Sequence, residues 1–179
     1  MRSPCIVKLV EFLQGKWLGH PLHPVIVHVP VGAWLAAFVI DVILVLGSSS
    51  AVLERVALWC VGVGLAGALL AVPPGVADWS LIKRDKPAWQ LGIWHMMLNL
   101  LAALAWAVNF GLRLSADGLA GEVTPPVLWS SVVGLALLLA GTYLGALMVF
   151  DHGIGVARQS KKKWRAIAAR GGANLPEEK

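Results

Sequence analysis

Four long apolar stretches dominate the chain, at residues 25–46, 56–76, 88–112 and 126–150. None of them contains Lys or Arg, and the first contains a single carboxylate, Asp41. A helix needs about 20 apolar residues to cross the hydrocarbon core of a bilayer. A helix on the surface of a soluble protein would show an apolar stripe and a polar opposite face, and these stretches show neither. The pattern predicts a bundle of four transmembrane helices.

The segments that flank this bundle are different in character. Near the N-terminus, apolar residues recur at helical spacing while charged residues lie elsewhere, which predicts a short helix in the membrane interface. The apolar positions of that helix are Ile6, Val10, Leu13 and Trp17. We therefore divide the chain into an N-terminal interfacial segment at 1–19, a four-helix transmembrane domain at 20–156 and a basic cytoplasmic tail at 157–179.

Composition supports an all-α membrane protein that uses the lipid bilayer as its solvent. Of the 179 residues, 58% are hydrophobic and only 14% are charged, which is too few to solvate a globular surface. Cys60 lies inside the second apolar stretch, so Cys5 and Cys60 provide no disulfide framework.

The positive charges predict how the chain sits in the membrane. Thirteen of the 15 Lys and Arg residues lie before the first stretch, between the second and third, or after the fourth. Lys and Arg near span ends stay on the cytoplasmic side, so we expect both termini to be cytoplasmic in a bacterial inner membrane. The remaining two, Arg55 and Arg113, are assigned to the connections on the other side. The basic tail is expected to contact anionic lipid rather than nucleic acid.

This orientation places the candidate functional residues at one face of the membrane. All five histidines of the chain are expected at the cytoplasmic face, together with two aspartates. Ionisable residues within a membrane are costly and are candidates for function. These residues are His20, His23 and His28 at the start of the first span, Asp78 after the second, His95 early in the third, and Asp151 with His152 at the end of the fourth.

Two of these histidines are expected to face each other inside the bundle. With a helical rise of about 1.5 Å per residue, His28 lies about 6 Å and His95 about 10 Å inside the membrane. Asn99 lies one turn deeper than His95. Pro30 cannot donate a backbone hydrogen bond, so the start of the first span is expected to be kinked beside this pair. A polar pocket is predicted here, to which Tyr143, Asp151 and His152 also contribute.

Several short motifs carry a resemblance to a known family. They are Gly-His-Pro-Leu-His-Pro at 19–24, His-Val-Pro-Val-Gly at 28–32, Gly-Val-Ala-Asp-Trp at 75–79, His95 with Asn99, Gly-Thr-Tyr-Leu-Gly at 141–145 and His-Gly-Ile-Gly-Val at 152–156. In these motifs the chain resembles a bacterial membrane family catalogued as domain of unknown function 2231. The resemblance implies four membrane helices and no established activity. Some members are joined to Rieske-type iron–sulfur domains, which implies electron transfer, although the two cysteines here cannot supply such a cluster.

Three hypotheses follow for the pocket. The first is a b-type haem or similar redox cofactor for electron transfer, with His28 and His95 as axial ligands and Asn99 beside them. The second is a transition-metal site for Fe, Cu or Zn, used in sensing, transport or metal-dependent chemistry; its ligands would be His20, His23, His28, His95 and Asp78. The third is a membrane scaffold or accessory subunit in which the His/Asp cluster is structural. Because no histidine lies near the opposite face, one cofactor at most is expected. A redox or membrane-protein partner fits the first hypothesis, whereas enzymatic activity and homo-oligomer formation are left open.

Overall fold

The computed structural model describes residues 4–47, 50–115, 123–155, 166 and 168–172, and this part of the chain is mostly helical and contains no strand. The predicted basic tail at 157–179 lies outside the described residues, except for 166 and 168–172. The elements are α1 (Pro4–Leu13), the 3-10 helix η1 (Lys16–Leu18), α2 (Leu22–Ile26), α3 (His28–Val45), α4 (Ala51–Trp79), α5 (Pro87–Ser115) and α6 (Pro125–Phe150).

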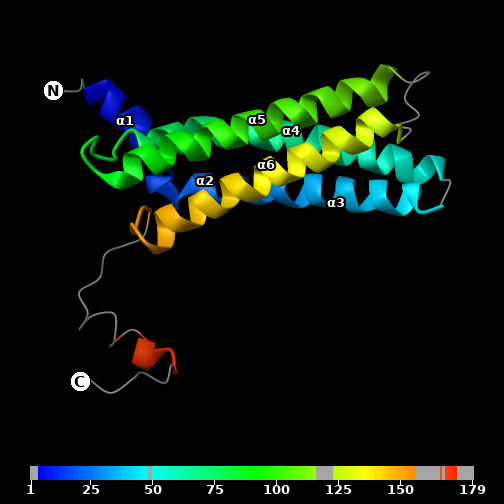
Figure 1. Ribbon diagram of the computed structural model, residues 1–179. Coiled ribbons are helices and arrows are strands. Elements are labelled where there is room, and N and C mark those ends of the chain that lie inside the picture. The colour runs from blue at the N-terminus through cyan, green and yellow to red at the C-terminus, as the bar shows by residue number, and fades with distance from the viewer. Residues whose placement is uncertain (1–3, 48–49, 116–122, 156–165, 167, 173–179) are drawn as a thin grey trace.

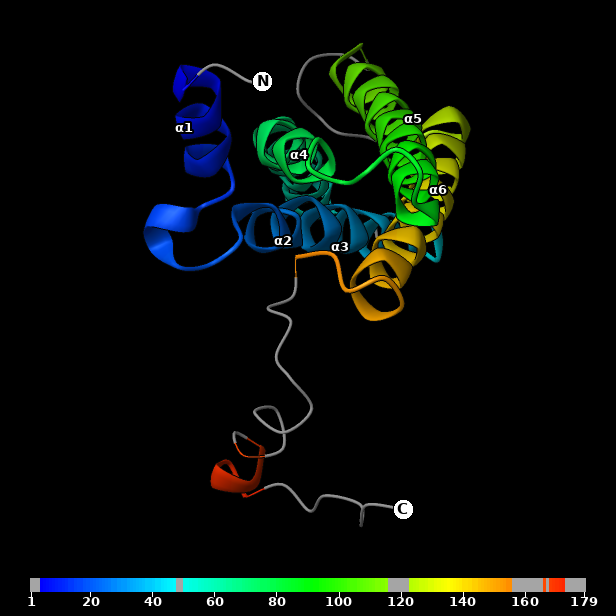
Figure 2. The same ribbon diagram turned by 90° about the vertical axis from the view of Figure 1, so that its left-hand side faces the viewer.

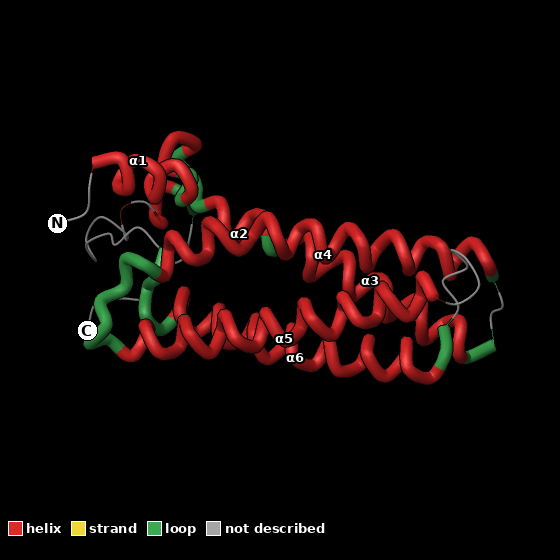
Figure 3. The backbone as a smooth tube through the Cα atoms, turned by 90° about the horizontal axis from the view of Figure 1, so that it is seen from above, coloured by secondary structure: helices red, strands yellow, loops and turns green. Residues whose placement is uncertain are grey.

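Four helices are long and apolar enough to cross a membrane, which confirms the predicted fold class. They run side by side, with the connections confined to the two ends of the bundle (Figures 1 and 3). Large apolar side chains on their outer surfaces are exposed, as expected where lipid is the solvent. The spans are Leu22–Val45, which joins α2 and α3, then Ala51–Trp79, Pro87–Ser115 and Pro125–Phe150.

The bundle is built from two helical hairpins. The most extensive packing joins α3 to α4 and α5 to α6, whereas α4 with α5 and α3 with α6 share smaller contacts. Figure 2 looks along the bundle from the end that carries α1, and there α5 and α6 lie together to one side of α4. We name this the histidine end, because α2 and the first turns of α5 lie there, and we name the opposite end the far end.

Local sequence explains where the helices begin and break. The Ser50 hydroxyl accepts a hydrogen bond from the backbone N–H of Leu53 at 3.4 Å and so caps α4. The predicted kink in the first span is the break between α2 and α3 at Val27, since Pro30 has no N–H for the carbonyl four residues earlier. α4 continues through Pro73 and Pro74 to Trp79.

The N-terminal segment folds back against the histidine end. Gly15 and Gly19 have φ of 75° and 69°, which ends α1 and turns the chain through η1. A Cβ at Gly15 would collide with the His20 carbonyl oxygen, so only glycine fits there. Phe12 and Trp17 stack with ring centroids 5.7 Å apart on the exposed surface. The predicted short N-terminal helix is therefore present, at Pro4–Leu13.

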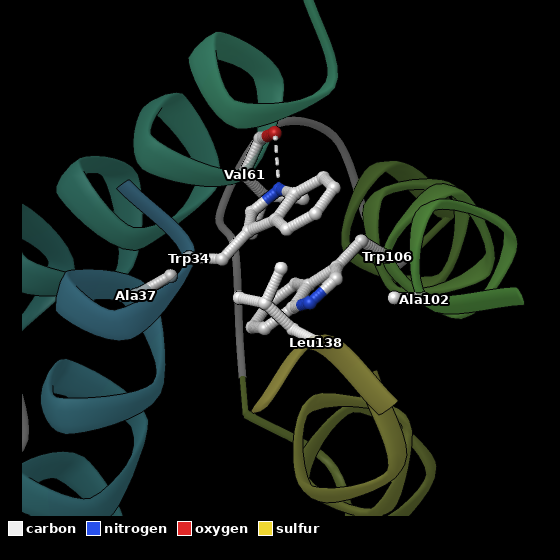
Figure 4. Packing of buried hydrophobic residues seen from close by; sticks show 6 residues of the cluster. All are labelled: Trp34, Ala37, Val61, Ala102, Trp106 and Leu138. Atoms are coloured by element: carbon white, nitrogen blue, oxygen red, sulfur yellow. Dashed lines mark hydrogen bonds between the residues drawn. The ribbon is translucent and has the colours of Figure 1, made fainter. Parts of the chain in front are cut away.

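A tryptophan pair forms the centre of the bundle. Trp34 of α3 and Trp106 of α5 stack with centroids 5.5 Å apart and planes 8° from parallel, and both are buried (Figure 4). The indole N–H of Trp34 donates to the carbonyl of Val61 at 3.3 Å, whereas the indole N–H of Trp106 is buried without an acceptor in the described structure. Leu138 of α6 packs beside the stack. The core thus joins the two hairpins through side chains of every spanning helix.

The far half of the bundle contains a buried ion pair, which corrects the placement of Arg113. Arg113 was assigned to a connection, but α5 runs on to Ser115 and buries the Arg113 guanidinium completely. Its Nη2 donates to both carboxylate oxygens of Asp41, at 2.5 and 2.6 Å. Its Nε donates to the Asn109 side-chain oxygen at 2.8 Å, and the Ser131 hydroxyl donates to Asp41 at 2.7 Å. This network links α3, α5 and α6.

Candidate functional site

The histidine end brings two imidazoles together across the seam between the hairpins. His23 comes from α2 and His95 from the third turn of α5. Their ring centroids are 6.3 Å apart and the ring planes are 81° from parallel. Both side chains are half-buried. The pair therefore joins groups that are 72 positions apart in the sequence.

Each of these rings is held by a backbone carbonyl of a neighbouring helix. His23 Nδ1 lies 2.9 Å from the carbonyl oxygen of Ala71 in α4. His95 Nδ1 lies 2.7 Å from the carbonyl oxygen of Gly141 in α6. A carbonyl oxygen only accepts, so Nδ1 must carry the proton in both rings. In the neutral rings Nε2 then presents a lone pair, the arrangement found for histidines that bind metals.

Glycines on the neighbouring helices make room for the two rings. A Cβ at Gly75 would lie 2.8 Å from His23 Nδ1, and a Cβ at Gly145 would lie 3.0 Å from His95 Cε1. A Cβ at Gly141 would lie 2.5 Å from the Asn99 side-chain nitrogen. The Gly-x-x-x-Gly pair of α6 is therefore an internal packing surface for His95 and Asn99.

Asn99 supports the turn that carries His95. Its side-chain nitrogen donates to the His95 carbonyl oxygen at 2.7 Å. The same nitrogen lies 3.3 Å from His95 Nδ1, but that ring nitrogen is already a donor to Gly141. Asn99 thus fixes the helix beside the ring and leaves the ring tautomer unchanged.

Asp78 lies at the outer edge of the site, where α4 meets the N-terminal segment. The Gln14 side-chain nitrogen donates to Asp78 Oδ1 at 3.1 Å. The Gln14 side-chain oxygen is buried and has no donor within the described residues. This contact ties the turn after α1 to the end of α4.

The remaining predicted residues do not join the histidine pair. His28 was expected to face His95, but it is exposed, and His23 is the ring that lies beside His95. The physical reason is that the span begins at Leu22 rather than near Pro24, so His23 already belongs to a helix of the bundle. The others are His20, Asp151 and Tyr143, which are exposed, and His152, which is half-buried.

No group of three or more His, Cys, Asp or Glu side chains that could hold a metal ion is found among the described residues. The predicted set of His20, His23, His28, His95 and Asp78 is therefore not gathered into one ligand cluster. The chemistry that the site offers is that of two imidazole nitrogens.

The family assignment agrees with this architecture. A family model described as a predicted membrane protein (DUF2231) matches residues 19–158. The chain belongs to this family. Residues 19–158 span the DUF2231 region from the turn before α2 to just beyond α6, so they include both histidines of the pair. Searches among curated proteins and among solved structures found no significant match to this DUF2231 chain.

Proposed function

We propose that this protein binds a b-type haem or a similar redox cofactor through His23 and His95 and serves electron transfer at a bacterial inner membrane. The observation that carries the proposal is that both rings have the same tautomer and the same kind of hydrogen bond. Each Nδ1 donates to a backbone carbonyl, and each Nε2 is left without a hydrogen-bond partner in the described structure. Each imidazole is thus prepared as a ligand.

The separation of the rings supports one shared metal centre. Because a metal–nitrogen bond is about 2.1 Å long, two imidazoles that would hold one metal ion must lie close together. The observed separation is 6.3 Å. Helix bundles commonly hold cofactors with side chains from facing helices, and here each hairpin supplies one ring.

The number of ligands favours haem over a bare metal ion. A structural zinc site uses four protein ligands and a catalytic one uses three, yet among the described residues two imidazoles lie together here, with no group of three or more possible ligands. Haem iron needs only axial ligands from the protein because the porphyrin supplies the other donors. When bound, such a group would supply one-electron chemistry.

The charge distribution supports a cytoplasmic position for the histidine end. Because Arg113 is paired with Asp41 inside the bundle, Arg55, in the second turn of α4, is the one other basic residue of the sequence near the far end. Lys and Arg flanking the spans therefore favour the histidine end as the cytoplasmic one even more strongly. The far half offers no histidine, so the cofactor would exchange electrons with a redox or membrane-protein partner at one face.

An absorption spectrum of protein purified in mild detergent tests the proposal. We expect a Soret band that shifts on reduction with dithionite, with one haem per chain. His23→Ala and His95→Ala should each abolish the band, whereas His28→Ala is a matched control that should retain it. Colourless protein, or a band that survives both substitutions, would refute the proposal. Stoichiometric iron, copper or zinc in colourless protein would identify a bare metal site instead.

A further inference from the structure

Three pairs of residues meet across the seam between the hairpins, and they share one spacing. His23 lies beside His95, Trp34 stacks on Trp106, and Asp41 pairs with Arg113. The members of every pair are 72 positions apart in the sequence. At these three positions, a residue of the first span therefore contacts its own counterpart in the third.

The second and fourth spans repeat in the same way, with a spacing of 70 positions. The tetrapeptide Val-Gly-Leu-Ala occurs at 63–66 and again at 133–136, in each case four residues after an exposed tryptophan, Trp59 or Trp129. The glycines that receive the paired rings obey this spacing too. Gly64 and Gly134 receive the two tryptophans, and Gly75 and Gly145 receive the two histidines.

Hydrogen bonds and burial repeat with the same two spacings of 72 and 70 positions. The two histidines bond to the carbonyls of Ala71 and Gly141, which are again 70 positions apart. Residues 28–41 and 100–113 show the same sequence of buried, half-buried and exposed positions. The buried pairs of this stretch are Pro30 with Ala102, Trp34 with Trp106, Ala37 with Asn109, and Asp41 with Arg113.

Equivalent helices also run in the same direction. Both α3 and α5 run from the histidine end to the far end, and both α4 and α6 return (Figure 1). Two units related in this way have their two-fold axis along the bundle, and hence along the membrane normal. The three contacting pairs then lie on or near that axis, since only there can a residue touch its own counterpart.

We propose that the two hairpins, α2–α3–α4 and α5–α6, are equivalent copies of one unit, and that the chain works as a fused pseudo-dimer whose ligand site lies on the two-fold axis. The part concerning the ligand rests on the proposed function. A site on this axis would be held by two equivalent imidazoles, one from each copy, and a haem iron is a centre that such a pair could hold.

The ion pair shows what fusion of the copies permits. In a true homodimer position 41 would meet its own copy, and two buried like charges would repel each other strongly. In a single chain the two positions can differ, and here they have become Asp41 and Arg113. The asymmetry extends to the residues that bond to this pair. The position equivalent to Asn109 in the other copy is Ala37, and the position equivalent to Ser131 is Val61.

Distances between spin labels test the equivalence directly. Cysteines for nitroxide labels are placed at Leu69 with Leu104, and in a second variant at Leu139 with Gly32, after Cys5 and Cys60 are replaced by serine. All four positions are exposed, and the open space around Gly32 accepts a side chain. A two-fold axis exchanges the two pairs, so double electron–electron resonance should give the same mean distance for both.

A register control sharpens this comparison. Moving the label from Gly32 to the exposed Ala36, one turn along α3, should break the match with the Leu69–Leu104 pair. Mean distances for the two equivalent pairs that differ by a helical turn, about 5.4 Å, or more would overturn the proposal. The measurement needs no ligand. A missing Soret band would therefore refute haem binding without affecting the repeat. Unequal distances would refute the repeat without affecting haem binding.

Transposing the ion pair tests whether the two positions are also chemically interchangeable. Asp41→Arg or Arg113→Asp alone buries like charges and should eliminate folded, monodisperse protein in detergent. The combined variant, with Ala37→Asn and Asn109→Ala added to move the amide partner, should recover most of it. Size-exclusion chromatography provides the readout. A transposed variant as poorly folded as either single variant would contradict the equivalence.

Discussion

Each histidine ring fits against the neighbouring helix because a glycine there leaves room for it. His23 lies against Gly75 and His95 against Gly145, so adding a methyl group at either glycine must move the ring. We expect Gly75→Ala and Gly145→Ala each to lower haem affinity roughly tenfold or more, the size typical for loss of a ligand's supporting contacts. Haem titration followed at the Soret band provides the measurement.

Gly32→Ala is the matched control for these two substitutions, because a Cβ at Gly32 has open space around it. All three variants should remain folded in detergent. Unchanged affinity in both Gly75→Ala and Gly145→Ala would show that the rings do not bind the cofactor in the observed orientation.

The two stacked tryptophans differ in one hydrogen bond. Trp34 donates to Val61, whereas the indole N–H of Trp106 is buried without an acceptor in the described structure. Trp34→Phe therefore loses a hydrogen bond worth about 1 kcal/mol, while Trp106→Phe removes an unsatisfied donor. We expect Trp34→Phe to have the lower unfolding temperature of the two in detergent. The reverse order would mean that Trp106 has a partner, such as a buried water.

At the scale of the elements, the ion pair in the far half fastens the two hairpins to each other. Asp41→Leu leaves the buried Arg113 guanidinium without its carboxylate, so we expect a loss of about 3–5 kcal/mol in the free energy of unfolding. Asp41→Leu/Arg113→Leu removes both charges and should be more stable than Asp41→Leu alone. Thermal unfolding in detergent tests this order, with the exposed Asp151→Leu as a control of small effect.

If Asp41→Leu is as stable as the unsubstituted protein, the pair does not hold the hairpins together. If the double variant is the less stable one, the guanidinium contributes contacts beyond its carboxylate, to Asn109 above all.

The helices could be predicted closely from the sequence because lipid exposure leaves long runs without charge. The largest error was at the start of α4, expected at residue 56 and found at Ala51, because Glu54 and Arg55 were read as a connection. The same rule placed Arg113 outside the membrane. A charge can lie inside a span where a distant residue neutralises it, and hydropathy alone does not reveal that partner.

The candidate site was predicted less well than the helices. The depth estimate chose His28 as the partner of His95, because it assumed a regular helix from Pro24 onward. The repeat would have pointed to His23, since the spacing from histidine to tryptophan is the same in His23 and Trp34 as in His95 and Trp106. The tautomers and the glycine contacts depend on packing between helices, which no single stretch of sequence encodes.

For the whole molecule, the face on which the histidine end lies decides which partners it can meet. We expect that end to be cytoplasmic, because the basic residues flanking the spans gather there. Asp151, at the histidine end, and Ala51, at the far end, are both exposed. In a background with Cys5→Ser and Cys60→Ser, a membrane-impermeant maleimide should label Ala51→Cys in intact spheroplasts, and label Asp151→Cys only after lysis. The opposite pattern would place the histidine pair at the outer face and require an electron partner outside the cytoplasm. Labelling of both in intact spheroplasts would mean a mixed orientation, which a single-sided site could not use.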